Sequence, residues 1–281
     1  MSKVRIITDS ASDLPIEIVE KYGIKVIGLD VIFGEDRFEE GVGMDNDTFY
    51  KRMKQESQLP KTACPSPDRF LDLYKEENTD VVVISISSKL SGTYNSAVLA
   101  KSMYDEDGGV DIRVIDTLSG SIGEGLLVYY AAKLSEDGKS ADEIEKAIMK
   151  LIDKEAFFGV LQTLENAIKG GRISKLAGSI INTFNFKALI KVEGGLVHPF
   201  DKARGEGNSV RKLISLFLDK QENTENKTLF IGHSNLPEKA EKVKIEIEKL
   251  KAFKEVVICE IGPIMGTYAA EGCILLNAAE I

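Results

Sequence analysis

Small hydroxyl residues and glycines gather in three loops of the chain, each expected near the end of a strand. The loops are Thr8-Asp9-Ser10, Lys61 to Pro67 and Ser87 to Tyr94. Ligands of parallel sheets bind at the carboxyl ends of the strands, where such loops meet. Thr62 and Ser91 could together donate two hydrogen bonds to one carboxylate or phosphate, which predicts an anion site built from hydroxyl groups.

The third loop has the features of an anion site at the start of a helix. Ser91 stands at the expected helix N-terminus, where free backbone N–H groups and the helix dipole favour negative charge. Gly92 would let a ligand approach the main chain. Thr93 and, from the first loop, Ser10 are supporting candidates. These hydroxyls could equally be helix caps without a ligand, and both interpretations stay open.

A fourth segment, Lys169 to Ser174, places paired glycines beside Arg172. A tight turn of this kind can present a guanidinium group to an anion. From this segment alone, a solvated arginine after a helix end is the favoured interpretation. Arg172 is therefore a supporting candidate for the anion site.

Familiar catalytic and metal-binding signatures are absent from the sequence. It contains no P-loop motif, no G-x-S-x-G, and no dinucleotide-binding spacing among Gly120, Gly123 and Gly125. His198 and His233 are the only histidines, and neither has a second ligand at metal-binding spacing. We therefore predict no metal site and no catalytic residue, and a structural role for His233.

Charge and cysteine content narrow the class of protein. The 281 residues carry a formal net charge of −9, which argues against nucleic-acid binding and against electrostatic attachment to anionic lipid. Three cysteines without metal or redox spacing favour a reducing cytoplasm. No apolar run approaches the roughly 20 residues of a membrane span, so no stable membrane insertion is expected.

The elements that must position these loops alternate between strand and helix in the first half of the chain. The continuous apolar run Val81 to Ser85 is typical of a buried parallel strand, and Ser66-Pro67 predicts a helix start. The expected strands here are 4–8, 24–31, 81–85 and 112–116, and the main expected helices are 16–22, 91–103, 119–134 and 140–154.

The second half changes in pattern. A Glu193-Gly194-Gly195 turn between two apolar runs predicts a hairpin, which introduces antiparallel pairing. The fold class expected is α/β with two domains. Residues 1–154 would form an N-terminal parallel-sheet α/β domain carrying the anion-binding loops, and residues 155–281 a C-terminal mixed-sheet α/β domain.

Taken together, the motifs resemble the DegV family of bacterial fatty-acid-binding proteins. SKLSGTYNSA, from Ser88 to Ala97, and KGGRIS, from Lys169 to Ser174, are specific in combination. The other matching pieces follow the family's order along nearly the whole chain: Thr8 to Ser10, Thr62 to Pro67, Lys187 to Ile190, Gly194-Gly195 and Gly262 to Gly266.

The resemblance implies a non-enzymatic lipid carrier. A long-chain fatty acid would lie with its tail in a buried apolar tunnel closed by the C-terminal domain, and its carboxylate on Thr62 and Ser91. The family arginine falls on Arg172. An ATP-dependent fatty acid kinase subunit would be the partner, so the chain would carry the acid but need no cofactor of its own.

Two departures from the family pattern concern the head group. The family's Thr-Ser-Gln-Pro is Thr62-Ala63-Cys64-Pro65 here, which keeps the hydroxyl and loses its polar neighbours. Tyr268 stands where the family has a histidine that reaches the head group, and Glu271 adds a negative charge nearby. A tyrosine can donate a hydrogen bond but cannot serve as a positive partner near neutral pH.

Two other functions remain as alternatives. The chain could be a small-molecule phosphotransferase or kinase-like domain, which would need a histidine at the cleft, and His233 is the only realistic candidate. It could also be a protein–protein module with an incidental pocket.

Overall fold

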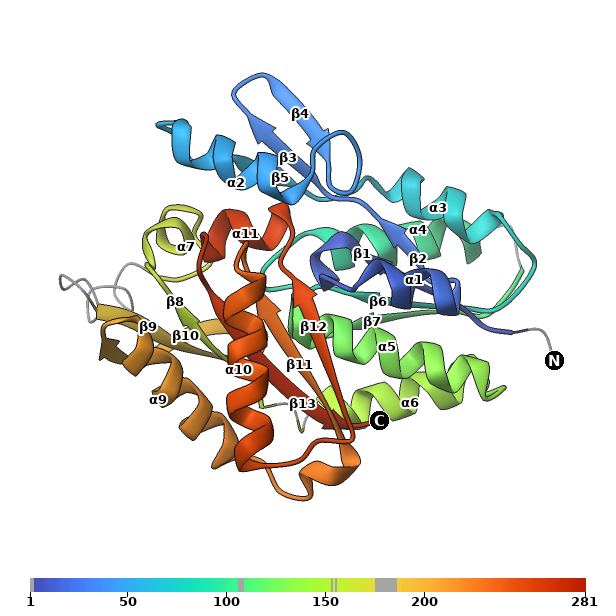
Figure 1. Cartoon of the computed structure of the whole chain (residues 1–281). Helices are drawn as coiled ribbons and strands as arrows, with labels where there is room; N and C mark the ends of the chain where they lie inside the picture. The colour runs from blue at the N-terminus through green and yellow to red at the C-terminus, as the bar shows by residue number, and fades with distance from the viewer. Residues whose placement is uncertain (1–2, 106–108, 153, 155, 175–185) are drawn as a thin grey trace.

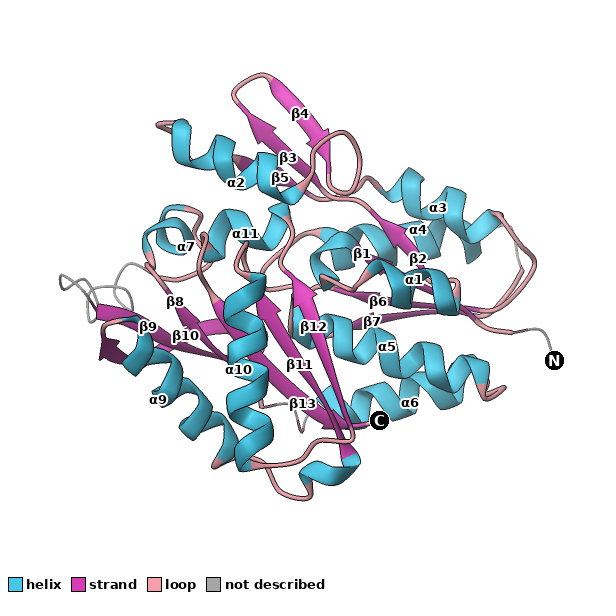
Figure 2. Ribbon diagram, viewed as in Figure 1, coloured by secondary structure: helices cyan, strands magenta, loops and turns pink. Residues whose placement is uncertain are grey.

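A computed structural model describes residues 3–105, 109–152, 154, 156–174 and 186–281. In these residues the chain forms a parallel sheet, a larger mixed sheet and a small antiparallel sheet, with helices packed around and between them (Figures 1 and 2). The α/β fold class expected from the sequence is confirmed.

The parallel sheet has the strand order β2-β1-β6-β7. Its strands are β1 (Arg5–Asp9), β2 (Lys25–Ile27), β6 (Val81–Ser85) and β7 (Ile112–Asp116). All five residues of β6 are buried, as a strand covered on both faces requires.

Helices cover both faces of this sheet. Alternate residues of β6 divide between two apolar clusters, so Val81 and Val83 meet one helix layer while Val82 and Ile84 meet the other. One layer contains α3 (Pro67–Lys75) and α4 (Thr93–Asp105). The other contains α1 (Ile16–Tyr22), α5 (Ile122–Glu136) and α6 (Ala141–Ile152).

The mixed sheet has the order β10-β9-β8-β13-β11-β12, in which only β11 and β12 pair in parallel. Its outer face is covered by α9 (Glu206–Leu218) and α10 (Pro237–Leu250) (Figure 1). The strands are β8 (Phe158–Leu161), β9 (Phe186–Glu193), β10 (Leu196–Arg204), β11 (Lys227–His233), β12 (Glu255–Glu260) and β13 (Ile274–Glu280).

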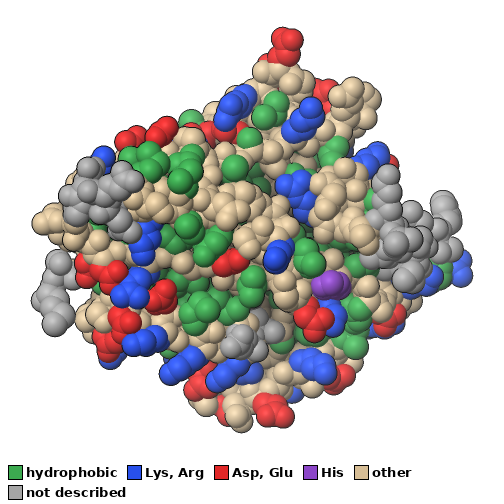
Figure 3. Space-filling model, turned by 180° about the vertical axis from the view of Figure 1, so that it is seen from behind, with side chains coloured by type: hydrophobic (Ala, Val, Ile, Leu, Met, Phe, Trp, Pro, Cys, Tyr) green, Lys and Arg blue, Asp and Glu red, His purple; other side chains and the backbone are tan. Residues whose placement is uncertain are grey.

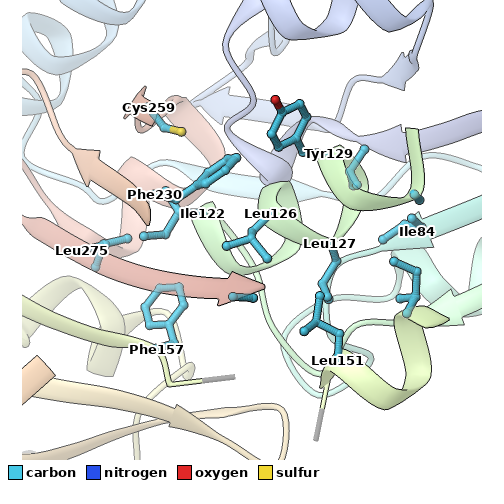
Figure 4. Close-up of a cluster of buried hydrophobic side chains, with 14 of the residues drawn as sticks. Ile84, Ile122, Leu126, Leu127, Tyr129, Leu151, Phe157, Phe230, Cys259 and Leu275 are labelled. Carbon is cyan, nitrogen blue, oxygen red and sulfur yellow. The ribbon is translucent and has the colours of Figure 1, made fainter. Parts of the chain in front are cut away.

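Helix α5 lies between the two sheets and contacts both. Figure 4 shows its side chains Ile122 and Leu126 beside Phe230 of β11 and Leu275 of β13, with Ile84 of the parallel sheet nearby. A helix that is apolar around most of its circumference is typical of such a fully buried position. The main core of the molecule is therefore shared by the two sheets.

The sequence prediction needs two corrections near the hydroxyl loops. Lys61 to Pro67 was expected to be a loop, but Lys61–Ala63 forms β5 and pairs with β3 (Asp30–Phe33), which also pairs with β4 (Asp36–Glu39). The expected strand 24–31 is likewise split into β2 and β3. Long-range pairing decides these short elements, and local sequence does not record it.

A second missed element is α11 (Pro263–Ala269), a short helix that no amphipathic pattern indicated. It packs between α2 (Asn46–Gln55) and α7 (Glu165–Lys169). The predicted helix 140–154 ends at Ile152, and residues 153 and 155 lie outside the described part of the chain. The division into domains at residue 154 stays a prediction.

Candidate functional site

A cavity lies between the carboxyl edge of the parallel sheet and the mixed sheet. About 780 Å³ there is not filled by atoms, open solvent at the mouth included, and the centre of a water molecule can reach about 80 Å³ of it. Most of its lining is apolar: Leu29, Ile86, Leu90, Gly120, Phe157, Leu161, Ala167, Ile190, Val192, Val197, Ile264, Met265, Ala269 and Leu275.

The polar part of the lining comes from Thr62, Ser91, Arg172, Tyr268 and Ser121. The first four are sequence candidates, drawn from four separate segments, and the structure brings them to one cavity. The Thr62 and Tyr268 hydroxyls lie 2.6 Å apart and share a hydrogen bond. This clustering is the most distinctive feature of the site.

Ser91 stands immediately before helix α4, two residues from its first residue, Thr93. Its hydroxyl accepts a 3.3 Å hydrogen bond from the Thr93 amide and lies 2.8 Å from the Thr93 hydroxyl. Thr93 itself is fully buried, so it supports Ser91 rather than lining the cavity. Both capping and cavity lining, the two roles left open by the sequence, apply to Ser91.

Gly92 lies against the cysteine of the β5 segment. A Cβ atom placed on Gly92 would stand 3.2 Å from the Cys64 sulfur. A side chain there would press on the strand that carries Thr62, so the glycine keeps the two hydroxyl segments close together.

Arg172 is held by backbone groups. Its Nε donates to the Leu90 carbonyl at 3.2 Å and its Nη1 to the Gly170 carbonyl at 2.7 Å. The guanidinium carbon lies 4.4 Å from the centre of the Tyr268 ring, a cation–π arrangement. The arginine is therefore part of the site and not the solvated residue favoured from the local sequence.

Tyr268 projects from α11 into the same cluster. A Cβ atom on Gly170 would come within 2.3 Å of the tyrosine ring, so the first of the paired glycines in the KGGRIS segment makes room for Tyr268. Glu271, the added negative charge of this region, forms an ion pair with Lys54 and accepts a 2.7 Å hydrogen bond from Asn235. Its charge is compensated outside the cavity lining.

Ser10 is placed differently from the other candidates. It belongs to the short 3-10 turn η1 (Ser10–Ser12), and its hydroxyl accepts a 3.0 Å hydrogen bond from the Leu29 amide. It is not among the described residues that line the cavity. Its hydroxyl lies near the carboxyl group of Glu40.

Sequence reasoning missed a group of carboxyl residues behind the cavity, in which Asp9, Asp13 and Glu124 are buried and Glu40 is half-buried with its Oε2 atom enclosed. Burial raises the pKa of Asp9 to about 6 and that of Glu40 to about 7. The pKa values of Asp13 and Glu124 are raised well above their usual range, by burial first and then by the neighbouring carboxylates. Glu124 did carry a signal, because it is the one acid in the apolar run 122–132.

The phosphotransferase alternative needs His233 at the cavity, but this histidine lies elsewhere and makes a structural hydrogen bond. His233 is buried, its Nδ1 accepts a hydrogen bond from the Leu236 amide at 3.2 Å, and burial lowers its pKa. It does not line the cavity. Among the described residues, no group of His, Cys, Asp and Glu side chains is arranged to hold a metal ion.

On the face seen in Figure 3, acidic and basic side chains are interspersed with hydrophobic ones, without an extended basic area. No helix in the described ranges has the length and apolar character needed to span a bilayer.

The arrangement suits a ligand with a long apolar body and one small polar end. Aliphatic and aromatic side chains would surround the body, while hydroxyl groups and one guanidinium group meet the end. Nothing in the lining resembles an activated nucleophile beside a general base.

The chain matches the DegV family model over residues 3–278. A fatty acid-binding protein of Thermotoga maritima is 32% identical to it over 283 residues, covering 97% of this chain and 96% of the relative.

Two solved structures extend the likeness to the fold. A DegV family protein from Ruminococcus gnavus, determined with vaccenic acid, has a TM-score of 0.91 at 26% identity, covering 98% of this chain and 99% of its own. The Fatty Acid Kinase B3 protein of Streptococcus pneumoniae, loaded with linoleic acid, has a TM-score of 0.87 at 26% identity, with 100% of both chains covered.

Proposed function

The chain belongs to the DegV family, and from that membership we propose that it binds one long-chain fatty acid in this cavity and presents it to a partner kinase. The observation that carries the proposal is the cavity itself, an apolar space whose polar lining is limited, among the described residues, to Thr62, Ser91, Ser121, Arg172 and Tyr268.

The acyl tail supplies most of the binding free energy. Removing about 15 methylene groups from water contributes roughly 12 kcal/mol at ~0.8 kcal/mol each. Lost translational freedom and ordering of the chain cost several kcal/mol of that sum. The affinity for the acid therefore depends chiefly on how many methylene groups the cavity can enclose away from water.

The head group is oriented by hydroxyl donors. In this proposal the fatty-acid carboxylate lies at Thr62 and Ser91, with Tyr268 and Arg172 beside them. These hydrogen bonds largely replace bonds to water, so they set direction and avoid a buried unpaired charge more than they add affinity.

Chemistry on the bound acid belongs to the partner. The sequence has no phosphate-binding loop, so we propose that an ATP-dependent kinase subunit supplies the nucleotide and phosphorylates the carboxylate. This chain acts as a carrier, with fatty acid as its ligand and no resident cofactor. All three cysteines are free thiols, which supports a reducing compartment such as the cytoplasm.

Native mass spectrometry of the purified chain tests the proposal directly. We expect one co-purifying fatty acid per chain, and a rise in melting temperature when palmitate is added to delipidated protein. Protein that carries no acyl ligand and gains no stability from palmitate would refute the function.

A matched pair of variants locates the tail. Ala167 is buried in the cavity lining, and Ala167→Gln places a bulky polar group there. We expect palmitate binding to be lost, while Ala252→Gln on an exposed loop keeps it. Equal binding by the two variants would place the tail elsewhere.

A further inference from the structure

Two buried carboxyl groups hold the start of helix α11. The Gly262 amide donates to Asp13 Oδ1 at 2.8 Å, and the Ile264 amide donates to Glu40 Oε1 at 2.9 Å. Asp13 and Glu40 come from the N-terminal part of the chain, about 220 to 250 residues away from the helix they hold. They act as side-chain acceptors for amides that no preceding turn of helix can satisfy.

The helix they hold forms one wall of the cavity. Ile264, Met265, Tyr268 and Ala269 of α11 all line it. With seven residues, α11 is too short to be stable without external contacts. The position of the Tyr268 hydroxyl therefore depends on the two carboxyl groups at the other end of the helix.

The backbone is strained at two residues near α11 and its carboxyl contacts, Ala270 and Ser121. Ala270, just after α11, has φ 60° and ψ 171°, a region open essentially to glycine alone, and the Ser234 hydroxyl holds its carbonyl at 2.7 Å. Ser121, with φ 51° and ψ −137°, lines the cavity and donates to the second oxygen of Asp13. Strain of this kind persists only where surrounding contacts enforce it, so α11 is clamped and not relaxed.

The surroundings of the two carboxyl groups are acidic. Asp9 faces both groups, and Asp13 also acts on Glu124 of α5 and on the hydroxyl of Tyr50 from α2. Asp13 also raises the pKa of the Cys259 and Cys273 thiols, after burial, which is the main cause for both. None of the groups found to act on Asp13 or Glu40 is a lysine, arginine or histidine.

One oxygen, Glu40 Oε2, is buried and has no hydrogen-bond partner. An ionised Glu40 would therefore place an unpaired negative charge beside Asp13, which costs more than burying the neutral acid.

The geometry points to a proton-linked clamp: Asp13 and Glu40 are positioning residues that dock α11, and with it Tyr268, over the bound acid, and they take up a proton as they do so. This inference rests on the proposed function, because it describes how the same cavity closes on its ligand.

The direction of the coupling follows from the environment of Glu40. Burial raises its pKa to about 7 when α11 is docked, whereas a hydrated carboxyl group has its ordinary value of 4.5. Between these two values the docked form is protonated and the undocked form is not. Affinity for the ligand should therefore be greatest at low pH, fall as the pH rises towards 7, and level off above it.

Calorimetric titration of the delipidated full-length chain at ~pH 6, in two buffers that differ in ionisation heat, measures this proton directly. We expect uptake of about one proton per ligand, and affinity that falls about twentyfold from ~pH 5.5 to ~pH 7.5. Palmitate and hexadecan-1-ol are both used, because the alcohol has no titrating head group.

Glu40→Gln should bind both ligands without proton uptake, while Glu143→Gln, which removes an exposed carboxylate from α6, should behave as wild type. If Glu40→Gln does not fold, Asp13→Asn replaces it, and the wild-type chain is titrated with the alcohol. Proton uptake with the alcohol supports the clamp, because the alcohol itself binds no proton in this pH range. Proton uptake with palmitate that persists in Glu40→Gln, while the wild-type chain takes up none with the alcohol, would assign the proton to the ligand and overturn the clamp.

Binding without any linked proton would overturn the clamp and leave the proposed function intact. Failure of either ligand to bind at any pH would remove both.

Discussion

At the scale of single residues, the phenol of Tyr268 lines the cavity at the position where the resemblance to the family led us to expect an imidazole. Tyr268 keeps hydrogen-bonding capacity and fills the space above Arg172, as its 4.4 Å ring contact shows. It gives up the positive charge that a histidine can carry. The head-group end therefore orients an acid with neutral donors and one guanidinium group that is already bonded to two carbonyls.

Removing the hydroxyls one at a time should have modest effects. Thr62→Val keeps the side-chain shape but deprives Tyr268 of its partner, and Ser91→Ala removes the second donor. Each should weaken palmitate binding by about 1 kcal/mol, or roughly fivefold, because a hydrogen bond to water is regained on release.

Displacement of a fluorescent fatty acid measures both dissociation constants. Ser102→Ala, on the exposed side of α4, is the control and should match wild type. An effect of a hundredfold or more at Thr62 would show that the head group, and not the tail, dominates.

At the scale of elements, α11 is the segment on which the site depends. It was invisible in the sequence because seven residues with two glycines nearby give no helical periodicity. Its position is fixed by Asp13 just after η1, Glu40 just after β4 and Thr62 of β5, and none of these contacts is local in sequence.

The strained residue after α11 offers a direct stability test. Ala270→Gly should raise the free energy of unfolding by about 1 kcal/mol, since glycine adopts this backbone conformation without a steric penalty. Ala269→Gly, one residue earlier in the helix, should instead lower it by about 0.5–1 kcal/mol. Urea denaturation of both variants measures the two signs, and a loss of stability in Ala270→Gly would contradict the strain.

Elements with strong local patterns could be predicted from the sequence. The strands Val81–Ser85 and Ile112–Asp116 were predicted with their observed bounds, and the Gly194-Gly195 turn does join a hairpin. Thr62, Ser91 and Arg172 were named as candidates and meet in one cavity. Hydrophobic period and turn chemistry are local properties, so they are legible in a single chain.

What could not be predicted depends on distant contacts. β5 is a strand because it pairs with β3, and the Glu40 carboxyl group accepts a hydrogen bond from the Ile264 amide at the start of α11. In the sequence, the segment of β3 and β4 followed by Glu40 indicates neither the pairing with β5 nor the contact with α11. The buried carboxyl group was therefore out of reach, except for Glu124 with its apolar neighbours.

At the scale of the whole molecule, the buried acids make stability depend on pH. Their raised pKa values mean that the folded state binds protons more tightly than the unfolded state. Their contribution is fully present below about pH 4 and is lost as the pH rises through about 6 to 7. The lowered pKa of His233 acts in the opposite direction.

Glu124→Gln should flatten this dependence. Glu124 is fully buried, its Oε2 has no partner, and Asp9 lies close enough to accept from an amide in its place. We expect the variant to melt higher than wild type at ~pH 8 and nearly equally at ~pH 5. Thermal unfolding at the two pH values measures the difference, and a lower melting temperature at ~pH 8 would contradict the assignment.

Because helix α5 packs against both sheets, the two sheets cannot move apart without exposing its side chains to water. Such a movement would expose four buried side chains of this helix, Ile122, Leu126, Leu127 and Val128. The loss of burial costs about 1.5–3 kcal/mol of free energy for each large side chain. In the proposed function, the fatty acid would instead enter and leave at the rim of the cavity, where short segments can move separately. The proposed ligand can then be exchanged without separating the two sheets that share the core.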